Sequence, residues 1–414
     1  MEIVAKLEVT KHAPIIRFRG FKDPWVDKKL GQIATFSKGK GISKLDIDPE
    51  GKLPCIRYAE LYTVYGEVIK DVVSHTSING EELTLSKEDD VIIPASGETA
   101  IDIARAACVV DAGVALGGDL NIIRSKMDGT FLAYCLNGVQ RIAIARFAQG
   151  SSVVHLYPSQ LKLLKLHLPT LPEQQKIAGF LSAVDARIQQ LTRKKALLEQ
   201  YKKGVMQQLF PSAGSGQAPE IRFTRADGGA FPEWEEKRLG SISKSFSGGT
   251  PRTGTTEYYN GTIPFIRSAE INAVRTELHI SEEGLSNCSA KMVQKGDLLF
   301  AMYGATAGEI GISRIEGAIN QAILCIRLKK DDVFYVYSYF LFMKERILST
   351  YLQGGQGNLS GGIVNDTMIP LPSLEEQQKI AGFLGALDAR VQAVGEQLAG
   401  AQRWKKGLLQ QMFV

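Results

Sequence analysis

The 414-residue chain is too long for one compact core, and its length favours two or three domains. With 44% hydrophobic and 22% charged residues, it has an ordinary globular composition that indicates neither disorder nor a fibrous fold. The net charge of +5 is mild but suits an anionic partner, and lysine and arginine cluster locally, as at residues 38–44 and 405–406.

Cysteine usage and hydropathy argue against several classes of protein. The five cysteines are scattered and never form a CxxC spacing, so we expect neither a disulfide framework nor a metal site. The N-terminus lacks the apolar run of a signal peptide, and no stretch approaches the roughly 20 apolar residues of a membrane span. We expect a cytoplasmic protein that does not contact a membrane.

Residues 1–168 form the first of two globular segments, which we call heads. Glycine and proline break short β-branched and aromatic runs such as VIIPASG (91–97), and a helix is expected over Thr130–Phe147. The loop FSKGKGISK (36–44) combines glycine, hydroxyl and basic residues, so backbone N–H groups and cations could approach phosphates or base edges there. A flexible turn is the alternative interpretation. A second polar loop, QGSSVVH, follows at 149–155.

Residues 169–211 are predicted to form a long helix. From Glu173 onward, apolar residues recur at alternating steps of four and three, which is typical of a coiled-coil seam. At about 1.5 Å per residue, such a helix spans roughly 57 Å. Gly179 and Gly204 lie inside it at a cost of about 1 kcal/mol each relative to alanine. Close helix approach and a tolerated defect are both open as explanations.

The second head, residues 212–372, has a similar pattern of short β-branched and aromatic runs, such as TIPFIRS (262–268), and a helix is expected over 331–352. Its loop FSGGTPRTGT (246–255) occupies the place of 36–44 in the first head. In the later loop GGQGNLSGG (354–362), polar side chains either read base edges or cap the following element.

Residues 373–414 are predicted to repeat the long helix. EQQKIAGFLSAVDAR begins at Glu173 and EQQKIAGFLGALDAR at Glu376, and about 38 consecutive positions repeat in register, which chance cannot produce. The heads echo one another more loosely, as in PIIRF and PEIRF or LPCIRYAEL and IPFIRSAEI. Two copies of one fold with different loops suit a protein that performs the same function on two different targets. The alternative is a duplicated enzyme domain whose two copies have diverged in sequence.

Two seams of equal length in one chain favour antiparallel pairing within the chain. The predicted fold is therefore α+β, with two α/β heads in tandem, separated by two long helices that form an antiparallel coiled coil with pseudo-twofold symmetry. Alternatively, each helix packs on its own head, and either arrangement leaves helix surface for a partner. The predicted coiled-coil and subunit-interface residues are Ile177, Phe180, Leu181, Val184, Ile188, Leu191, Ile380, Phe383, Leu384, Leu387, Val391 and Val394.

Searches for catalytic signatures find none. The chain has no HExxH, no GxSxG, no GxxxxGK[ST] and no GxGxxG after a strand, and its five histidines are not clustered. We therefore expect no catalytic residues in this chain.

Over nearly its whole length, the sequence resembles the specificity (S) subunit of type I restriction-modification systems. The resemblance rests on the tandem heads, the LPxLxEQQKIAGFL openings of the helices, and the motifs SGGTPRTG, IPFIRSAEI and GNLSGG. The resemblance implies that the heads are target recognition domains, each reading one half of a bipartite, asymmetric double-stranded DNA site, while the paired helices set the spacing. It also implies two methyltransferase (modification) subunits that dock on the helices and bind SAM. Two restriction/translocase subunits with ATP and Mg would join them where restriction occurs.

The first head departs from this pattern, because it carries SKGKGISK and GSSVVH in place of SGGTP and GNLS. It therefore resembles a different subtype of recognition domain. The predicted DNA-contact residues are Lys38, Lys40, Lys44, Arg57, Tyr62, Ser151, Lys244, Thr250, Arg252, Arg267, Tyr303, Gln356, Asn358 and Ser360. A coiled-coil scaffold whose two heads bind proteins rather than DNA is the alternative function.

Overall fold

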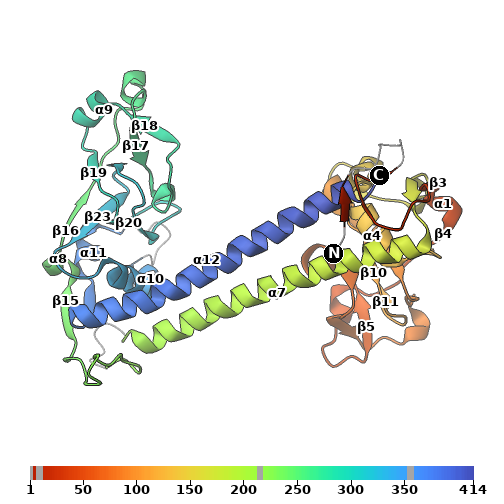
Figure 1. Cartoon of the computed structure of the whole chain (residues 1–414), viewed down its shortest axis with the longest axis horizontal. Coiled ribbons are helices and arrows are strands. Elements are labelled where there is room, and N and C mark those ends of the chain that lie inside the picture. Colours follow the sequence, from red (N-terminus) through yellow and green to blue (C-terminus); the bar gives the residue numbers. More distant parts are fainter. Residues whose placement is uncertain (1–2, 6–12, 212–217, 352–358) are drawn as a thin grey trace. The chain divides into compact units, whose positions relative to one another are not determined.

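The computed structural model describes residues 3–5, 13–211, 218–351 and 359–414 (Figure 1). The chain divides into two compact units, Met1–Thr192 with Glu396–Val414, and Arg193–Gly395. Each unit holds one head, the first turns of the long helix that follows this head, and the last turns of the other long helix.

The first head is built on a mixed sheet with strand order β4–β12–β8–β10–β6. Strand β8 (Asp90–Pro94) is buried along its whole length because both of its faces are covered. Val91 and Ile93 share a core with helix α4 (Gly129–Asn137), whereas Ile92 packs with Ile56 of the smaller sheet β11–β5–β7.

The remaining elements of this head are short. The strands are β1 (Ile3–Ala5), β2 (Ile16–Phe18), β3 (Val26–Lys29), β4 (Ala34–Lys38), β5 (Leu53–Ile56), β6 (Val68–Ile69), β7 (Ser74–Thr76), β9 (Ser96–Gly97), β10 (Ala107–Val109), β11 (Ala115–Leu116), β12 (Leu120–Ser125), β13 (Val154–His155) and β14 (Lys165–Leu168). The helices and 3-10 turns are α1 (Leu30–Ile33), η1 (Lys44–Asp46), α2 (Glu60–Thr63), η2 (Gly80–Glu82), α3 (Ala100–Ile103), α5 (Arg141–Phe147) and α6 (Pro158–Leu161).

The second head repeats this layering with strand orders β16–β23–β20–β21 and β18–β17–β22–β19. In β20 (Leu298–Ala301), Leu298 and Phe300 pack with helix α10 (Val333–Tyr351), while Leu299 packs with the second sheet. The other elements are β15 (Glu235–Arg238), α8 (Leu239–Ile242), β16 (Ser243–Ser247), η3 (Thr256–Tyr259), β17 (Ile263–Ile266), η4 (Ser268–Glu270), β18 (Leu278–Ile280), α9 (Glu282–Ser286), β19 (Lys291–Val293), β21 (Ile310–Ile312), β22 (Gly317–Ile319), β23 (Ile323–Leu328), α11 (Gly361–Asp366) and β24 (Met368–Leu371).

The helical stretch expected over Thr130–Phe147 is confirmed except for a break at Gly138, which divides it into α4 and α5. A Cβ at Gly138 would lie 3.1 Å from the Tyr134 carbonyl oxygen and 3.3 Å from that of Leu409. The break therefore lets the chain approach the last turns of the second long helix. In the second head, the corresponding α10 is continuous from Val333 to Tyr351, as predicted.

The two predicted long helices are α7 (Leu171–Leu209) and α12 (Leu374–Gln411). In the first unit, Leu181 near the start of α7 shares a core with Leu408 near the end of α12, so the helices run antiparallel there. In the second unit, Leu209 near the end of α7 packs with Leu384 near the start of α12. Both cores also contain head residues, so the helices pair with each other and pack on the heads at once.

Candidate nucleic-acid interface

An ion pair at the start of each repeat joins the head to the helix that follows it. Arg17 of β2 donates from Nε to Oε1 of Glu173 at 2.7 Å, and both side chains are buried. In the second head, Arg222 donates from Nη2 to Oε2 of Glu376 at 2.9 Å, and Trp234 donates to the same oxygen at 3.1 Å. The arginines of PIIRF and PEIRF are thus partners of the two glutamates.

The glutamine that follows each glutamate makes a second connection. Gln174 accepts a hydrogen bond from the backbone N–H of Asp128, the residue that caps α4, at 3.2 Å. Gln377 accepts the corresponding bond from Asp332, before α10, at 2.9 Å. Each glutamine also donates to the carbonyl of the proline just after the last strand of its head. The EQQ sequence, which is identical in the two repeats, therefore forms the same connection between head and helix twice; we call this connection the head–helix joint.

The same aspartate–arginine ion pair also occurs within one sheet of each head. The β8 carboxylate of Asp90 accepts two hydrogen bonds from Arg124, and Asp297 accepts corresponding bonds from Arg327. Burial raises the pKa of Asp297, but the hydrogen bonds from Arg327, the Gln294 N–H and Cys325, together with the Arg327 charge, outweigh it and hold this pKa below its ordinary value.

The two predicted contact loops are anchored by their backbones in equivalent ways. The Lys40 N–H donates to the Leu116 carbonyl of β11 at 2.9 Å, and a Cβ on Gly39 would lie 2.5 Å from that oxygen. In the second head, a Cβ on Gly248 would lie 1.8 Å from the Ile319 carbonyl oxygen of β22. These glycines permit close approach of two backbones. The glycine segment of each loop is therefore held against a neighbouring strand by backbone contacts.

The predicted basic residues of these loops remain at the surface. The side chains of Lys38, Lys40, Lys44, Lys244 and Arg252 are exposed. Thr250 is also exposed, and its hydroxyl donates to the side-chain oxygen of Gln321. The exposed cations lie where they could reach phosphate oxygens, which is the sequence-independent part of DNA binding.

Arg57 and Arg267 are held within their own motifs. In RYAE, an Arg57 Nη2 atom lies 3.5 Å from the Glu60 carboxylate, and Glu60 is buried. In RSAE, Arg267 donates to Glu270 at 3.0 Å and also pairs with Glu277. The hydrogen bonds to these two acids raise the pKa of Arg267. Both arginines thus already have carboxylate partners at equivalent positions of the two heads.

The other predicted contacts have varied surroundings. Tyr62 is half-buried, and its hydroxyl donates to the Ser96 carbonyl at 3.0 Å, while Tyr303 packs against the core of the second head. Ser151 is exposed. Ser360 caps α11 by accepting the Ile363 N–H at 3.2 Å, which was the alternative role proposed for this loop. Gln356 and Asn358 lie outside the described residues.

Two exposed rings of the first head lie beside a predicted contact lysine, although they are not among the predicted contact residues. His155 and Tyr157 stack with ring centroids 6.2 Å apart, and the Lys38 Nζ atom lies 5.9 Å from the Tyr157 ring centroid. Both side chains are exposed, whereas their neighbours Val154 and Leu156 are buried. This alternation in VHLY was a readable signal that His155 and Tyr157 face solvent. They place two exposed rings beside a predicted contact lysine.

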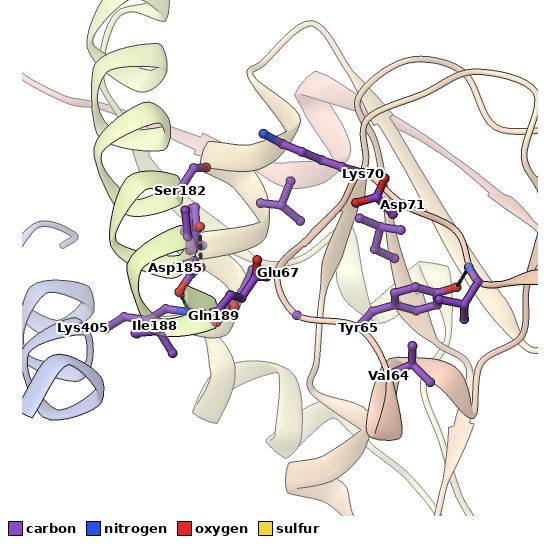
Figure 2. A pocket seen from close by; sticks show the side chains of 16 residues that line it. Val64, Tyr65, Glu67, Lys70, Asp71, Ser182, Asp185, Ile188, Gln189 and Lys405 are labelled. Atoms are coloured by element: carbon purple, nitrogen blue, oxygen red, sulfur yellow. Dashed lines mark hydrogen bonds and ion pairs between the residues drawn. The ribbon is translucent and has the colours of Figure 1, made fainter. Parts of the chain in front are cut away.

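A partly buried charge cluster joins the last turns of α12 to the first head. Figure 2 shows Lys405 between Glu67 and Asp185, and its Nζ atom is 2.7 Å from a carboxylate oxygen of each. Tyr134 donates to Asp185 at 2.6 Å. Burial raises the pKa of both Asp185 and Tyr134, and the opposing effect of Lys405 on Asp185 is smaller. In the second unit, the corresponding Lys202 pairs with Asp388.

Most of the predicted interface residues are buried. Nine of these side chains are buried, namely Ile177, Phe180, Leu181, Val184, Leu191, Ile380, Leu384, Leu387 and Val394. Ile188, Phe383 and Val391 are half-buried, and the Phe383 ring packs edge-on against Phe223. A Cβ at Gly179 or Gly204 would meet no neighbouring atom within 4 Å, so close helix approach does not explain these glycines.

Among the described residues, no group of three or more His, Cys, Asp or Glu side chains could hold a metal ion. No helix in that part of the chain is long and apolar enough to cross a membrane.

Two heads of one architecture, each joined to a long helix by the same arginine–glutamate pair, define a duplicated module with divergent loops. A family model described as the type I restriction modification DNA specificity domain matches residues 22–200 and again 232–399. The chain therefore belongs to this family, and its heads are DNA target recognition domains of a type I specificity subunit.

Similar proteins cover the whole length. The MjaVIII specificity subunit of Methanocaldococcus jannaschii is 23% identical, and the match spans 94% of this chain and 91% of that protein. The EcoKI specificity subunit of Escherichia coli K12 is 20% identical, with 91% and 85% covered. The crystal structure of the S subunit from M. genitalium has a TM-score of 0.65 at 16% identity and covers 97% of this chain. The last of these likenesses concerns the fold alone.

Proposed function

We propose that each head reads one half of a bipartite, asymmetric site in double-stranded DNA, and that the chain itself is not an enzyme. The observation that carries this proposal is the contrast between framework and loops. The head–helix joint and the loop anchors are the same in both heads, whereas the exposed loop residues differ, for example Lys40 and Lys44 against Thr250 and Arg252. Equivalent frameworks with different exposed side chains suit two different base sequences.

The long helices would set the distance between the half-sites and dock two modification subunits, which supply SAM and methyl transfer. Two restriction subunits with ATP and Mg would join where the host restricts DNA. A structure of 19% identical sequence, with a TM-score of 0.56, is described as concerning complex assembly and conformational transition of the type I R-M system. The exposed faces of α7 and α12, rather than the buried seam, would meet these partners. A subunit of this kind would act in the cytoplasm.

Exchange of one head tests this assignment. We would replace residues 1–165 with the head of another specificity subunit, assemble the chimera with its modification subunits, and map methylated adenines in host DNA by single-molecule sequencing. We expect one half-site to change while the other half-site and the spacing persist. The matched chimera, in which residues 212–372 are replaced, should change the other half-site.

A change in both half-sites, or in neither, would contradict the proposal. The scaffold alternative is tested by binding at different salt concentrations. A DNA reader loses affinity for its duplex as salt rises, with a slope set by the number of phosphate contacts. A protein-binding scaffold would show no preference for any duplex.

A further inference from the structure

Leu45, at the centre of the 3-10 turn η1, is 96% exposed. Among the described residues, every other large apolar side chain is at most 61% exposed. Exposed leucines are common on protein surfaces and usually have no special role. Leu45 differs from these because its side chain contacts almost nothing in its own chain, so burial on folding contributes no stabilising free energy at this position.

The backbone before Leu45 is held in an unusual conformation. Gly41 and Ile42 have φ of +65° and +58°, and Ile42 is one of two non-glycine residues with positive φ in the described chain. A β-branched residue in this region costs about 1–3 kcal/mol and persists only where its surroundings hold it. Here Ile42 is buried in a small core with Cys55 and Ala115. This burial fixes the direction in which the turn leaves the head.

Hydrogen bonds then fix the turn itself. Asp46 accepts the Ser43 N–H at 2.6 Å, and the Ser43 hydroxyl accepts the Leu45 N–H at 3.2 Å. The Asp46 carbonyl accepts the Thr76 hydroxyl of β7 at 2.7 Å. The turn that carries the leucine is therefore hydrogen-bonded within itself and to strand β7 of the β11–β5–β7 sheet. Its exposure is a property of the turn's construction.

The charge around the turn indicates the kind of partner. Lys44, the first residue of η1, and Lys40, four residues before it, are both exposed, and neither forms an ion pair within the described residues. The carboxylate of Asp46 accepts a hydrogen bond within the turn, and that of Asp48 accepts one from Ser77. A single leucine in a loop with two exposed lysines is unlike the centre of a protein interface, where charged residues are depleted. It fits a DNA groove, where lysines meet phosphates.

We infer that Leu45 is a wedge that enters a base step of the half-site read by the first head. Proteins that kink DNA insert leucine and other apolar side chains between base pairs, at a cost of a few kcal/mol per unstacked step. The corresponding turn of the second head, η3 (Thr256–Tyr259), has the exposed polar residues Thr256 and Glu257 instead. The wedge is therefore specific to one head. This inference rests on the proposed reading of DNA by the heads.

The test uses the chain assembled with its modification subunits and a duplex carrying the mapped site. 2-Aminopurine replaces one base at a time across the half-site of the first head, because its fluorescence rises when stacking is lost. We expect binding of the unaltered complex to raise the fluorescence at one step. Leu45→Ala should lose this rise and bind the site about tenfold more weakly, a loss equivalent to about 1.4 kcal/mol.

Two control variants make the result interpretable. Leu45→Met keeps an apolar side chain of similar length, so it should retain the fluorescence rise. Val274→Ala truncates a residue of the second head that is 61% exposed, and it should leave the signal unchanged.

A rise that persists in Leu45→Ala overturns the wedge. So does a weakened assembly with the modification subunits at unchanged fluorescence, because Leu45 would then contact a protein. If the unaltered complex binds no duplex preferentially, the proposed function itself fails, and this inference fails with it.

Discussion

Glu173→Gln should destabilise the first unit far more than an exposed charge change does. Glu173 and Arg17 are 1% and 8% exposed and form two hydrogen bonds, of 2.7 and 2.8 Å. The amide would leave the arginine charge buried without its counter-charge, and removal of one partner of a buried ion pair costs about 3–5 kcal/mol. Glu199→Gln is the matched control, because its i,i+4 pair with Lys195 is about half exposed and worth less than about 0.5 kcal/mol.

Hydrogen exchange measured by mass spectrometry can follow each unit separately, which a single unfolding curve of the whole chain cannot. In Glu173→Gln, amides of the first head and the first turns of α7 should exchange with an opening free energy lowered by about 3–5 kcal/mol. Amides of the second head should be unchanged. A loss below about 1 kcal/mol, similar to that of an exposed pair, would refute the argument that this pair secures the joint.

Three other outcomes follow from particular groups. Lys405→Met should lower the stability of the first unit more than Lys202→Met lowers that of the second, because it removes the cation from two partly buried carboxylates rather than one; hydrogen exchange would show the difference. Asp297 stabilises the second unit above about pH 4, since its pKa is below the unfolded value, and this contribution is lost as pH falls through the folded pKa. Asp297→Asn should therefore show a weaker loss of stability between about pH 5 and 3, with equal acid sensitivity counting against the argument. A maleimide should label Cys288 alone in the folded protein, because the other four cysteines are buried; labelling that persists in Cys288→Ser would contradict this.

The periodic elements could be predicted from the sequence because their signal is repeated many times. The helices α7 and α12 begin and end within a few residues of the expected limits, since the apolar seam extends along about 38 residues. The break between α4 and α5 was not predictable in the same way. It depends on one glycine, Gly138, and on the close approach of Leu409 from the far end of the chain.

Individual site residues were harder to assign, because their roles depend on partners distant in sequence. Glu67 and Lys405 pair across 338 positions, and no local pattern indicates this. For Arg57 and Arg267, a local signal did exist. Each precedes a glutamate by three residues, a spacing at which opposite charges meet, so their pairing could have been expected from RYAE and RSAE.

The head–helix joint described above has a consequence for how recognition could change. Its parts, an arginine near the start of the head and a backbone N–H at the start of the helix after the sheet, are the same in both heads. A foreign head with these two groups could attach to either glutamate–glutamine pair. If the heads read half-sites as proposed, a head attached at either pair would bring its own half-site to the recognised sequence, and neither long helix would need to change.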